Sequence, residues 1–129
     1  MRTIFSADAP APIGPYSQAI QTSHFVFCSG QVPIVPSKGA LIEGDISAQA
    51  EQALKNLGAV LLAAGAGYGD VVKTTIFLVD MADFASVNTV YARYFGDNKP
   101  ARTTVAVAGL PLGARVEIDA IALVQQTRT

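Results

Sequence analysis

The chain has 129 residues, of which 50% are hydrophobic and 15% are charged, and 9 basic against 10 acidic residues give a formal net charge of −1. This balance predicts one folded domain over residues 1–129 with a sizeable core, and it argues against a disordered tail. It also argues against nucleic-acid and anionic-membrane partners, because both attract clustered Lys and Arg.

A single cysteine, Cys28, and a single histidine, His24, limit the chemistry further. Structural zinc sites need four Cys or His ligands, and a Ser-His-Asp triad is possible only if His24 serves in it. Cys28 lies within a predicted strand and is interpreted as a small buried hydrophobe, with a catalytic thiol as the alternative. His24 is interpreted as a solvated turn residue.

The chain start lacks the apolar stretch of a signal peptide, and no run approaches the roughly 20 apolar residues of a membrane span. We therefore expect a soluble cytoplasmic protein from a reducing compartment.

The first third of the chain predicts an extended arm followed by two strands. Pro10, Pro12 and Pro15 favour turns in the arm. Two segments then show the alternation of strands, Ser17–Gln21 and Phe25–Val32, and the three residues between them suit a hairpin turn.

From Ile46 the hydrophobic period becomes that of a helix. Asp45 suits the N-cap, and Gly65 suits the C-terminal stop. The apolar stripe of this helix consists of Ile46, Ala50, Ala53, Leu54, Leu57, Leu61 and Ala64. The glycines at 65, 67 and 69 resemble a phosphate loop in spacing. They lead from a helix into a strand, opposite to the dinucleotide motif, so we interpret them as a helix-terminating turn.

The second half predicts a strand at Val71–Val79, a helix at Met81–Phe95 capped by Asp80, and two last strands at Arg102–Ala108 and Arg115–Val124. The stripe of this second helix consists of Phe84, Val87, Tyr91, Tyr94 and Phe95. The order of elements predicts an α+β domain with two helices on one face of a mixed sheet.

The other face of that sheet has an apolar row that no third helix would cover. One row of the last strand can face the helices, formed by Val116, Ile118, Ala120, Ala122 and Val124. The opposite row becomes apolar at Ile121 and Leu123, and Phe25 and Phe27 pose the same problem on an earlier strand. A second copy of the chain is the simplest cover, which predicts a homo-oligomer. Scattered surface apolar residues are the alternative.

Arg102 opens a strand of otherwise uncharged residues. Its guanidinium is always charged and presents a planar fork that suits a carboxylate. If the last two strands paired as a hairpin, Arg102 would share a sheet face with Glu117 and Asp119. On spacing alone, a cross-strand ion pair is the favoured interpretation, and a ligand site is the alternative.

Several polar or small residues interrupt apolar patterns. Asn88 borders the stripe of the second helix, where its amide needs a partner, so it caps backbone or braces a site. Tyr16 follows a rigid Gly-Pro turn. Ser29 and Gly30 interrupt an apolar strand, and glycine allows a close backbone approach. Ordinary loop and packing roles are the alternative for these residues.

Taken together, six segments in this order resemble the Rid/YjgF family, specifically its RidA-type members. They are Ile13–Gln18, Ser29–Pro33, Gly69–Thr75, Asp83–Asn88, Pro100–Arg102 and Val116–Ala122. The resemblance covers nearly the whole chain and implies a chorismate-mutase-like fold and a homotrimer with sites in the clefts between subunits. It also implies hydrolysis of enamines and imines, such as 2-aminoacrylate and 2-iminobutanoate, to 2-keto acids and ammonia, without a metal or organic cofactor.

The resemblance further assigns roles. The arginine that matches Arg102 binds the substrate carboxylate, and the glutamate that matches Glu117 positions the attacking water. The implied pocket lining comprises Tyr16, Ser29, Gly30 and Asn88. Thr104 stands where many bacterial members have cysteine, and its backbone amide could still contact the substrate.

Three other functions remain open at this point. A non-catalytic sensor of 2-keto acids or other small carboxylates would use the same Arg102 clamp. A ribonuclease or translation inhibitor, reported within the family, is disfavoured by the near-neutral charge and by the lack of a histidine pair. A chorismate mutase rests on fold analogy alone.

Overall fold

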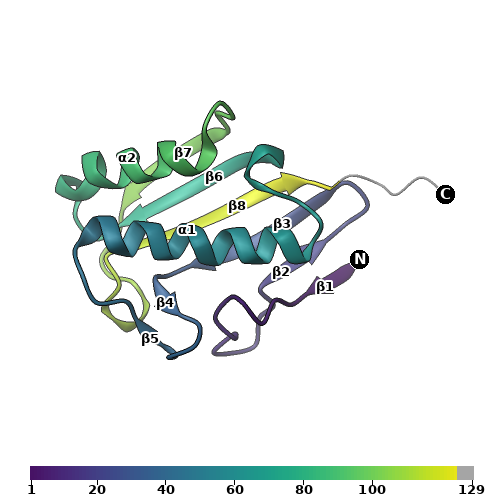
Figure 1. The fold of residues 1–129 in the computed structure, drawn as a ribbon, viewed down its shortest axis with the longest axis horizontal. Coiled ribbons are helices and arrows are strands. Elements are labelled where there is room, and N and C mark those ends of the chain that lie inside the picture. Colours follow the sequence, from purple (N-terminus) through teal and green to yellow (C-terminus); the bar gives the residue numbers. More distant parts are fainter. Residues whose placement is uncertain (125–129) are drawn as a thin grey trace.

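The computed structural model describes residues 1–124 and folds them into a sheet with two α-helices on one face (Figure 1). The strands of the main sheet are β1 (Arg2–Ile4), β2 (Ala19–Gln21), β3 (Phe25–Gln31), β6 (Val71–Leu78), β7 (Ala101–Ala106) and β8 (Val116–Leu123). Their spatial order is β1-β2-β3-β8-β6-β7, and every neighbouring pair is antiparallel except the parallel pair β6–β7. The predicted α+β class with a mixed sheet is therefore confirmed.

The first helix begins and ends as its capping residues predict, whereas the second begins later than predicted. In α1 (Ile46–Ala63) the Asp45 side chain accepts a hydrogen bond from the backbone N–H of Ala48, and Gly65 follows the helix with a φ of +78°. The second predicted helix divides into a 3₁₀ turn, η2 (Met81–Asp83), and α2 (Phe84–Phe95). The glycines that follow α1 form a turn that leads through η1 (Tyr68–Asp70) into β6, as interpreted from the sequence.

Three short strands lie outside the predictions. They are β1 and the separate hairpin of β4 (Ile34–Val35) and β5 (Ala40–Leu41). The boundaries of the predicted strands shift by one to two residues at several ends, for example from Arg102–Ala108 to the observed Ala101–Ala106. Such short or terminal segments are held by tertiary contacts more than by their own pattern.

The last two strands do not pair as the hairpin that the sequence analysis considered. Strand β6 lies between β7 and β8, and β7 runs parallel to β6. Parallel strands need a crossover connection, and α2 supplies it in the unit β6–α2–β7. The chain then passes through η3 (Pro111–Gly113) to reach β8 on the other side of β6.

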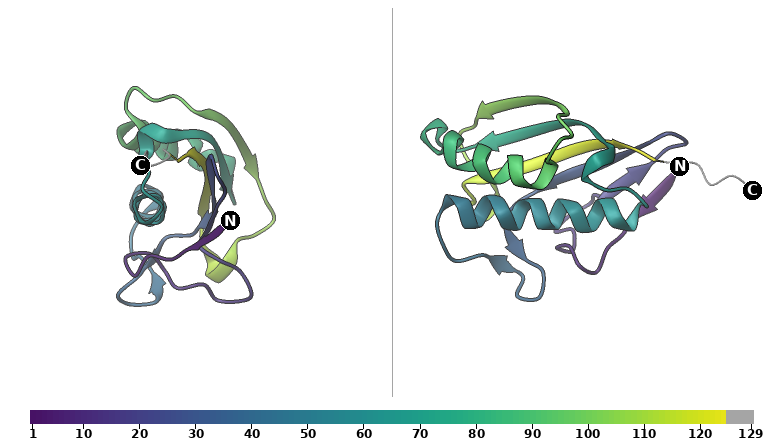
Figure 2. Two further views of the ribbon diagram at one scale, coloured as in Figure 1. Left: turned by 90° about the vertical axis from the view of Figure 1, so that its right-hand side faces the viewer. Right: turned by 45° about the horizontal axis from the view of Figure 1, so that its top comes forward.

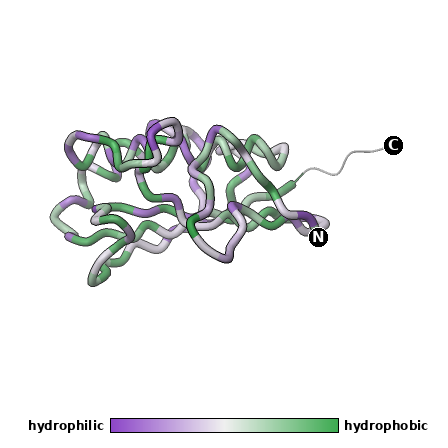
Figure 3. Tube along the Cα trace, turned by 90° about the horizontal axis from the view of Figure 1, so that it is seen from below, coloured by the Kyte–Doolittle hydropathy of each residue, from purple (hydrophilic) through white to green (hydrophobic). Residues whose placement is uncertain are grey.

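The two helices lie in one layer over the sheet (Figure 2), and the buried hydrophobic core consists of residues from both layers. The predicted stripe of α1 is buried throughout, and so is the predicted inner row of β8 from Val116 to Ala122. Hydrophobic stretches occur in both layers, interrupted by hydrophilic residues (Figure 3). The two layers therefore stabilise each other by burying one face of each.

Among residues 1–124 no helix covers the opposite face of the sheet (Figure 2). Phe25, Phe27 and Leu123 remain 37%, 45% and 47% exposed, so the predicted uncovered apolar row is present in the single chain. A second copy as its cover stays a prediction. No helix in residues 1–124 combines the length and hydrophobicity needed to cross a membrane.

Candidate functional site

The strand register places Arg102 and Glu117 on opposite faces of the sheet. Arg102 pairs with Thr74, which is fully buried beneath the helices, so the two share the helical face. Glu117 pairs with Phe77, three residues further along β6 and therefore on the uncovered face. Arg102 and Glu117 therefore do not share one face, because their partners on β6 lie an odd number of residues apart.

The Arg102 side chain lies against α2. Its Nη1 donates a hydrogen bond of 2.7 Å to the Asn88 side-chain oxygen, and its guanidinium carbon lies 4.9 Å from the centre of the Tyr91 ring and 5.4 Å from that of Phe84. Arg102 forms no ion pair within residues 1–124. The cross-strand ion pair is therefore excluded for the part of the chain that the structure describes.

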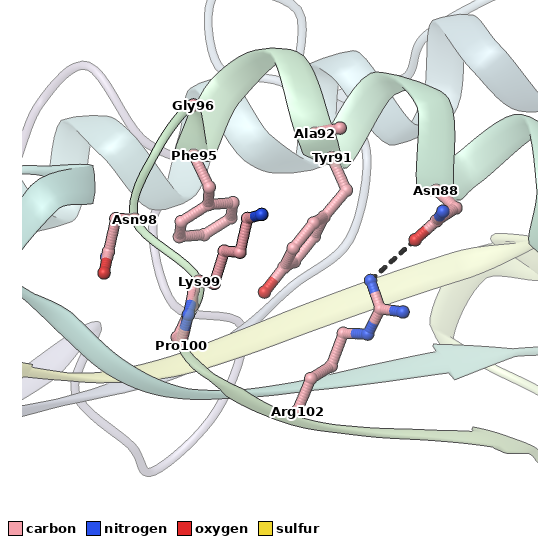
Figure 4. Close-up of a pocket in the computed structure, with 9 residues that line it drawn as sticks. All are labelled: Asn88, Tyr91, Ala92, Phe95, Gly96, Asn98, Lys99, Pro100 and Arg102. Carbon is pink, nitrogen blue, oxygen red and sulfur yellow. Dashed lines mark hydrogen bonds between the residues drawn. The ribbon is translucent and has the colours of Figure 1, made fainter.

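A cavity of about 420 Å³ opens beside Arg102, between α2 and the start of β7 (Figure 4). We call it the arginine pocket, and it is lined by Asn88, Tyr91, Ala92, Phe95, Gly96, Asn98, Lys99, Pro100 and Arg102. Its lining contains two cationic residues, Lys99 and Arg102, and no acidic one. The pocket is thus electrostatically suited to an anion.

Glu117 lies in a second cavity of about 460 Å³, on the uncovered side of the sheet. We call it the glutamate pocket, and it is lined by Ile13, Tyr16, Ser29, Gly30, Val32, Ile34, Pro111, Leu112 and Glu117. Burial raises the pKa of the Glu117 carboxyl, and the negative charge of Asp119 raises it further. A carboxylate with a raised pKa is a better proton acceptor than an ordinary one.

A glycine makes room for Glu117. The Glu117 carboxylate occupies the position that a Cβ at residue 30 would take. Strand β3 carries one extra residue between Cys28 and Gln31 relative to β8, and this bulge contains Ser29 and Gly30. Bulges commonly redirect side chains beside functional sites, which fits the close approach seen here.

Two polar residues of the glutamate pocket, Ser29 and Tyr16, form hydrogen bonds with the backbone. The Ser29 hydroxyl donates a 2.7 Å hydrogen bond to the Ser17 carbonyl, which ties the Tyr16 segment to β3. The Tyr16 phenol oxygen accepts a 3.4 Å hydrogen bond from the Ile13 N–H, and its side chain is largely exposed. The structure therefore brings Tyr16, Ser29, Gly30 and Glu117 together in one pocket and places Asn88 with Arg102 in the other.

Thr104 lies two residues after Arg102 and on the same face of β7. Its hydroxyl oxygen is buried and has no hydrogen-bond partner within residues 1–124. It lines neither of the two pockets.

The cysteine and the histidine take the places that the sequence predicts. Burial raises the pKa of the Cys28 thiol to about 12, which makes it a poor nucleophile. His24 is exposed in the β2–β3 turn. Within residues 1–124 no group of three or more His, Cys, Asp or Glu side chains could hold a metal ion.

The sequence interpretation missed two sets of residues. Phe84 and Tyr91 were assigned only to the core stripe of α2, although they also face Arg102. Their spacing of four and three residues from Asn88 puts all three on one helical face, and this signal was available. The apolar wall of the glutamate pocket, which includes Leu112, gave no comparable pattern, because its members come from separate loops.

Comparison with known proteins adds an independent finding. The model of the family described as Endoribonuclease L-PSP matches residues 6–124. A mouse protein named 2-iminobutanoate/2-iminopropanoate deaminase is 52% identical over 95% of this chain and 90% of its own length.

Solved structures of similar proteins have the same fold as this chain. A crystal structure from Thermotoga maritima, described as that of a candidate endoribonuclease, superposes with a TM-score of 0.95 at 48% identity, covering 98% of this chain and 99% of the other. E. coli TdcF with bound serine superposes with a TM-score of 0.93 at 39% identity, covering 97% of this chain and 100% of the other. Fold and sequence similarity therefore extend over nearly the whole chain.

Proposed function

We propose that this chain, which belongs to the endoribonuclease L-PSP (YjgF/Rid) family, is a deaminase that hydrolyses 2-imino acids to 2-keto acids and ammonia. The substrates are small enamines and imines such as 2-aminoacrylate and 2-iminobutanoate, and no metal or organic cofactor takes part. The observation that carries the proposal is the Arg102 guanidinium, which lines a pocket and has no acidic partner among the described residues. The name of the mouse relative supports the same chemistry.

Binding begins with the substrate carboxylate. Arg102 has five N–H donors, of which one bonds to Asn88, so a fork remains for the two carboxylate oxygens. Such a bidentate contact fixes the orientation of the imine carbon. The implied contacts of Thr104 and of the glutamate-pocket residues complete the proposed binding site.

Hydrolysis then needs one ordered water. Glu117 accepts a proton as the water oxygen bonds to the carbon of the protonated imine, which gives a neutral carbinolamine. Return of the proton to nitrogen lets the C–N bond break, ammonia leaves, and loss of the hydroxyl proton completes the keto group. Tyr16, Ser29 and the backbone at Gly30 would bind polar atoms of the intermediate.

A site that contains both Arg102 and Glu117 requires two copies of the chain in this proposal. The two side chains lie on opposite faces of one sheet, and β7 is an edge strand that a neighbour could approach. We propose the homotrimer with intersubunit sites that the family resemblance implies. The uncovered apolar row with Phe25 and Phe27 supports such an assembly. The cytoplasm is the proposed location.

The test is a trapping competition with Arg102→Ala. An amino-acid oxidase generates 2-iminobutanoate, semicarbazide traps it, and an active deaminase lowers the yield of semicarbazone. We expect the wild type to lower this yield and Arg102→Ala to leave it at the enzyme-free level. Arg93→Ala, an exposed arginine of α2 outside the arginine pocket, should behave as the wild type. Equal trapping with the wild type and Arg102→Ala would falsify the proposal.

A second candidate is a non-catalytic binder of 2-keto acids or other small carboxylates. The relative that supports it is E. coli TdcF, whose structure holds serine. It predicts that 2-ketobutyrate binds to the wild type, that Arg102→Ala loses this binding, and that neither protein changes the yield of semicarbazone. The ribonuclease suggested by the family description remains disfavoured, because the chain has one histidine and a net charge of −1.

A further inference from the structure

The surroundings of Arg102 hold a cation without neutralising it. The Tyr91 and Phe84 rings face the guanidinium at 4.9 and 5.4 Å, within the range of a cation–π interaction. The hydrogen-bond acceptor is the neutral amide of Asn88. A carboxylate in that place would hold the side chain as firmly but would compete with an anionic ligand.

The Tyr91 ring is itself held in place by contacts with strand β6 and with Phe95. Its hydroxyl shares a 2.8 Å hydrogen bond with the buried Thr74 side chain, and the Phe95 ring stacks on it with centres 4.3 Å apart and planes at 30°. In Figure 4 the Tyr91 ring lies between Phe95 and Arg102. Tyr91 is 7% exposed, so burial raises the pKa of its phenol, while the Thr74 hydrogen bond and the Arg102 charge oppose that shift.

The stem of Arg102 lies in a less buried place than the Tyr91 ring. It projects from an exposed edge strand, and an arginine side chain has many rotamers to lose when it binds a ligand. A ring that faces the guanidinium restricts those rotamers and uses none of its N–H donors. The cost of ordering the side chain then falls before the ligand arrives.

We propose that Tyr91, fixed by Thr74 and Phe95 and assisted by Phe84, is a positioning residue that preorganises the Arg102 fork for the substrate carboxylate. The inference rests on the proposed function, because positioning matters only if Arg102 binds the ligand. It adds a pair of aromatic residues from α2 to the site.

The experiment compares Tyr91→Leu with Tyr94→Leu. Tyr94 lies on the same helix, but its ring packs against Tyr68 and its hydroxyl donates to Glu51 rather than facing Arg102. We expect Tyr91→Leu to raise the KM for 2-iminobutanoate and the Kd for 2-ketobutyrate about five- to tenfold. Its kcat should stay within about twofold of the wild type, since the ring does not touch the water or the imine carbon. Tyr94→Leu should change neither constant.

Two further variants separate positioning from general support of the fold. Tyr91→Phe keeps the ring and should retain most of the affinity. In an Arg102→Lys background, Tyr91→Leu should have an effect below about twofold, because an ammonium has no planar fork to orient. If Tyr91→Leu does not fold, Phe84→Leu replaces it, and a KM increase without a kcat change is again expected.

The outcomes distinguish this inference from the proposed function. An unchanged KM in Tyr91→Leu overturns the positioning role, and so does an equal penalty in the Arg102→Lys background or in Tyr94→Leu. If Arg102→Ala keeps full deaminase activity and ligand affinity, the proposed function fails as well. Loss of activity in Arg102→Ala with an unaffected Tyr91→Leu removes the positioning role alone.

Discussion

The two pockets keep a charged group available in different ways. In the arginine pocket the cation is largely exposed, and its contacts within residues 1–124 are two aromatic rings and a neutral amide. In the glutamate pocket the carboxylate is half-buried, and a second carboxylate, Asp119, acts on it through its charge. One group thus keeps its charge for an anion, and the other holds its proton more tightly than usual.

Arg115 is an example of a guanidinium that is already paired with a carboxylate. Its Nη2 bonds to both carboxylate oxygens of Asp83 at 2.8 and 2.9 Å, so this guanidinium is already paired with an acid. Such an exposed pair contributes little to stability and leaves little positive charge for a ligand. Arg102 and Arg115 are both exposed, but Arg115 is paired with a carboxylate and Arg102 with a neutral amide. The charge of the partner, and not the exposure, therefore distinguishes a structural arginine from a candidate binding residue.

Glu117→Gln should give the largest change in the glutamate pocket. Because the amide cannot accept the proton of the attacking water, kcat should fall about 100-fold. The Kd for 2-ketobutyrate should stay within about twofold, in contrast to Tyr91→Leu, which should change affinity alone. Steady-state kinetics and calorimetric titration measure the two quantities. An equal loss of affinity in Glu117→Gln would remove the proposed division between binding and proton transfer.

The same variant also tests the sign of the pKa shift. A carboxyl whose pKa is raised in the folded state lowers stability as pH rises above its ordinary value. Glu117→Gln should therefore increase the melting temperature at neutral pH, and the gain should vanish below the ordinary pKa of glutamate. A gain that persists in acid would show that the shift has another cause.

Gly30→Ala should have the next largest effect. The new Cβ takes the place of the Glu117 carboxylate, which can rotate away because it ends a flexible side chain. We expect a fall in kcat of about tenfold with little change in unfolding free energy. Gly69→Ala is the matched control, because no atom lies within 4 Å of the Cβ that it would add. Equal activities for the two variants would show that the position of Glu117 is unimportant.

Local patterns in the sequence predicted the helices and most strands of the main sheet, because stripes and alternation are encoded within each segment. They did not predict which strands pair. The position of β6 between β7 and β8 depends on the α2 crossover, and the register of both strands with β6 puts Arg102 and Glu117 on opposite faces. The bulge that brings Gly30 to Glu117 is likewise a matter of register between two distant strands. The residue types of the candidate site were therefore predictable, but their division between two pockets was not.

Asp119→Asn should produce a smaller change, confined to pH dependence. Its carboxylate raises the pKa of Glu117, so removing the charge should move the acidic limb of the kcat profile to lower pH. Asparagine keeps an oxygen that can accept the hydrogen bond from the Thr75 N–H. We expect the maximum kcat to be unchanged. The pH dependence of kcat, measured between mildly acidic and neutral pH for the wild type and the variant, tests this prediction. A shift toward higher pH would contradict the assigned cause.

Leu112→Asn should have the smallest effect of these variants, and the effect is on stability. It tests whether the glutamate pocket, unlike the arginine pocket, contains a strained backbone conformation. Leu112 has a φ of +60°, a left-handed conformation that leucine adopts at a cost of about 1 kcal/mol, whereas no residue of the arginine pocket other than Gly96 has a positive φ. Asparagine tolerates this conformation, and the leucine side chain is 59% exposed, so little apolar burial is lost.

We expect Leu112→Asn to raise the free energy of unfolding in urea by about 0.5 kcal/mol. Leu62→Asn, at an exposed position in α1, should instead lower it by about the same amount, because asparagine is the poorer helix former. If both variants lose stability equally, the backbone conformation of Leu112 does not lower the free energy of unfolding. A gain in Leu112→Asn alone would mean that the loop beside Glu117 keeps a costly leucine, which is the behaviour expected of a residue retained for the pocket rather than for the fold.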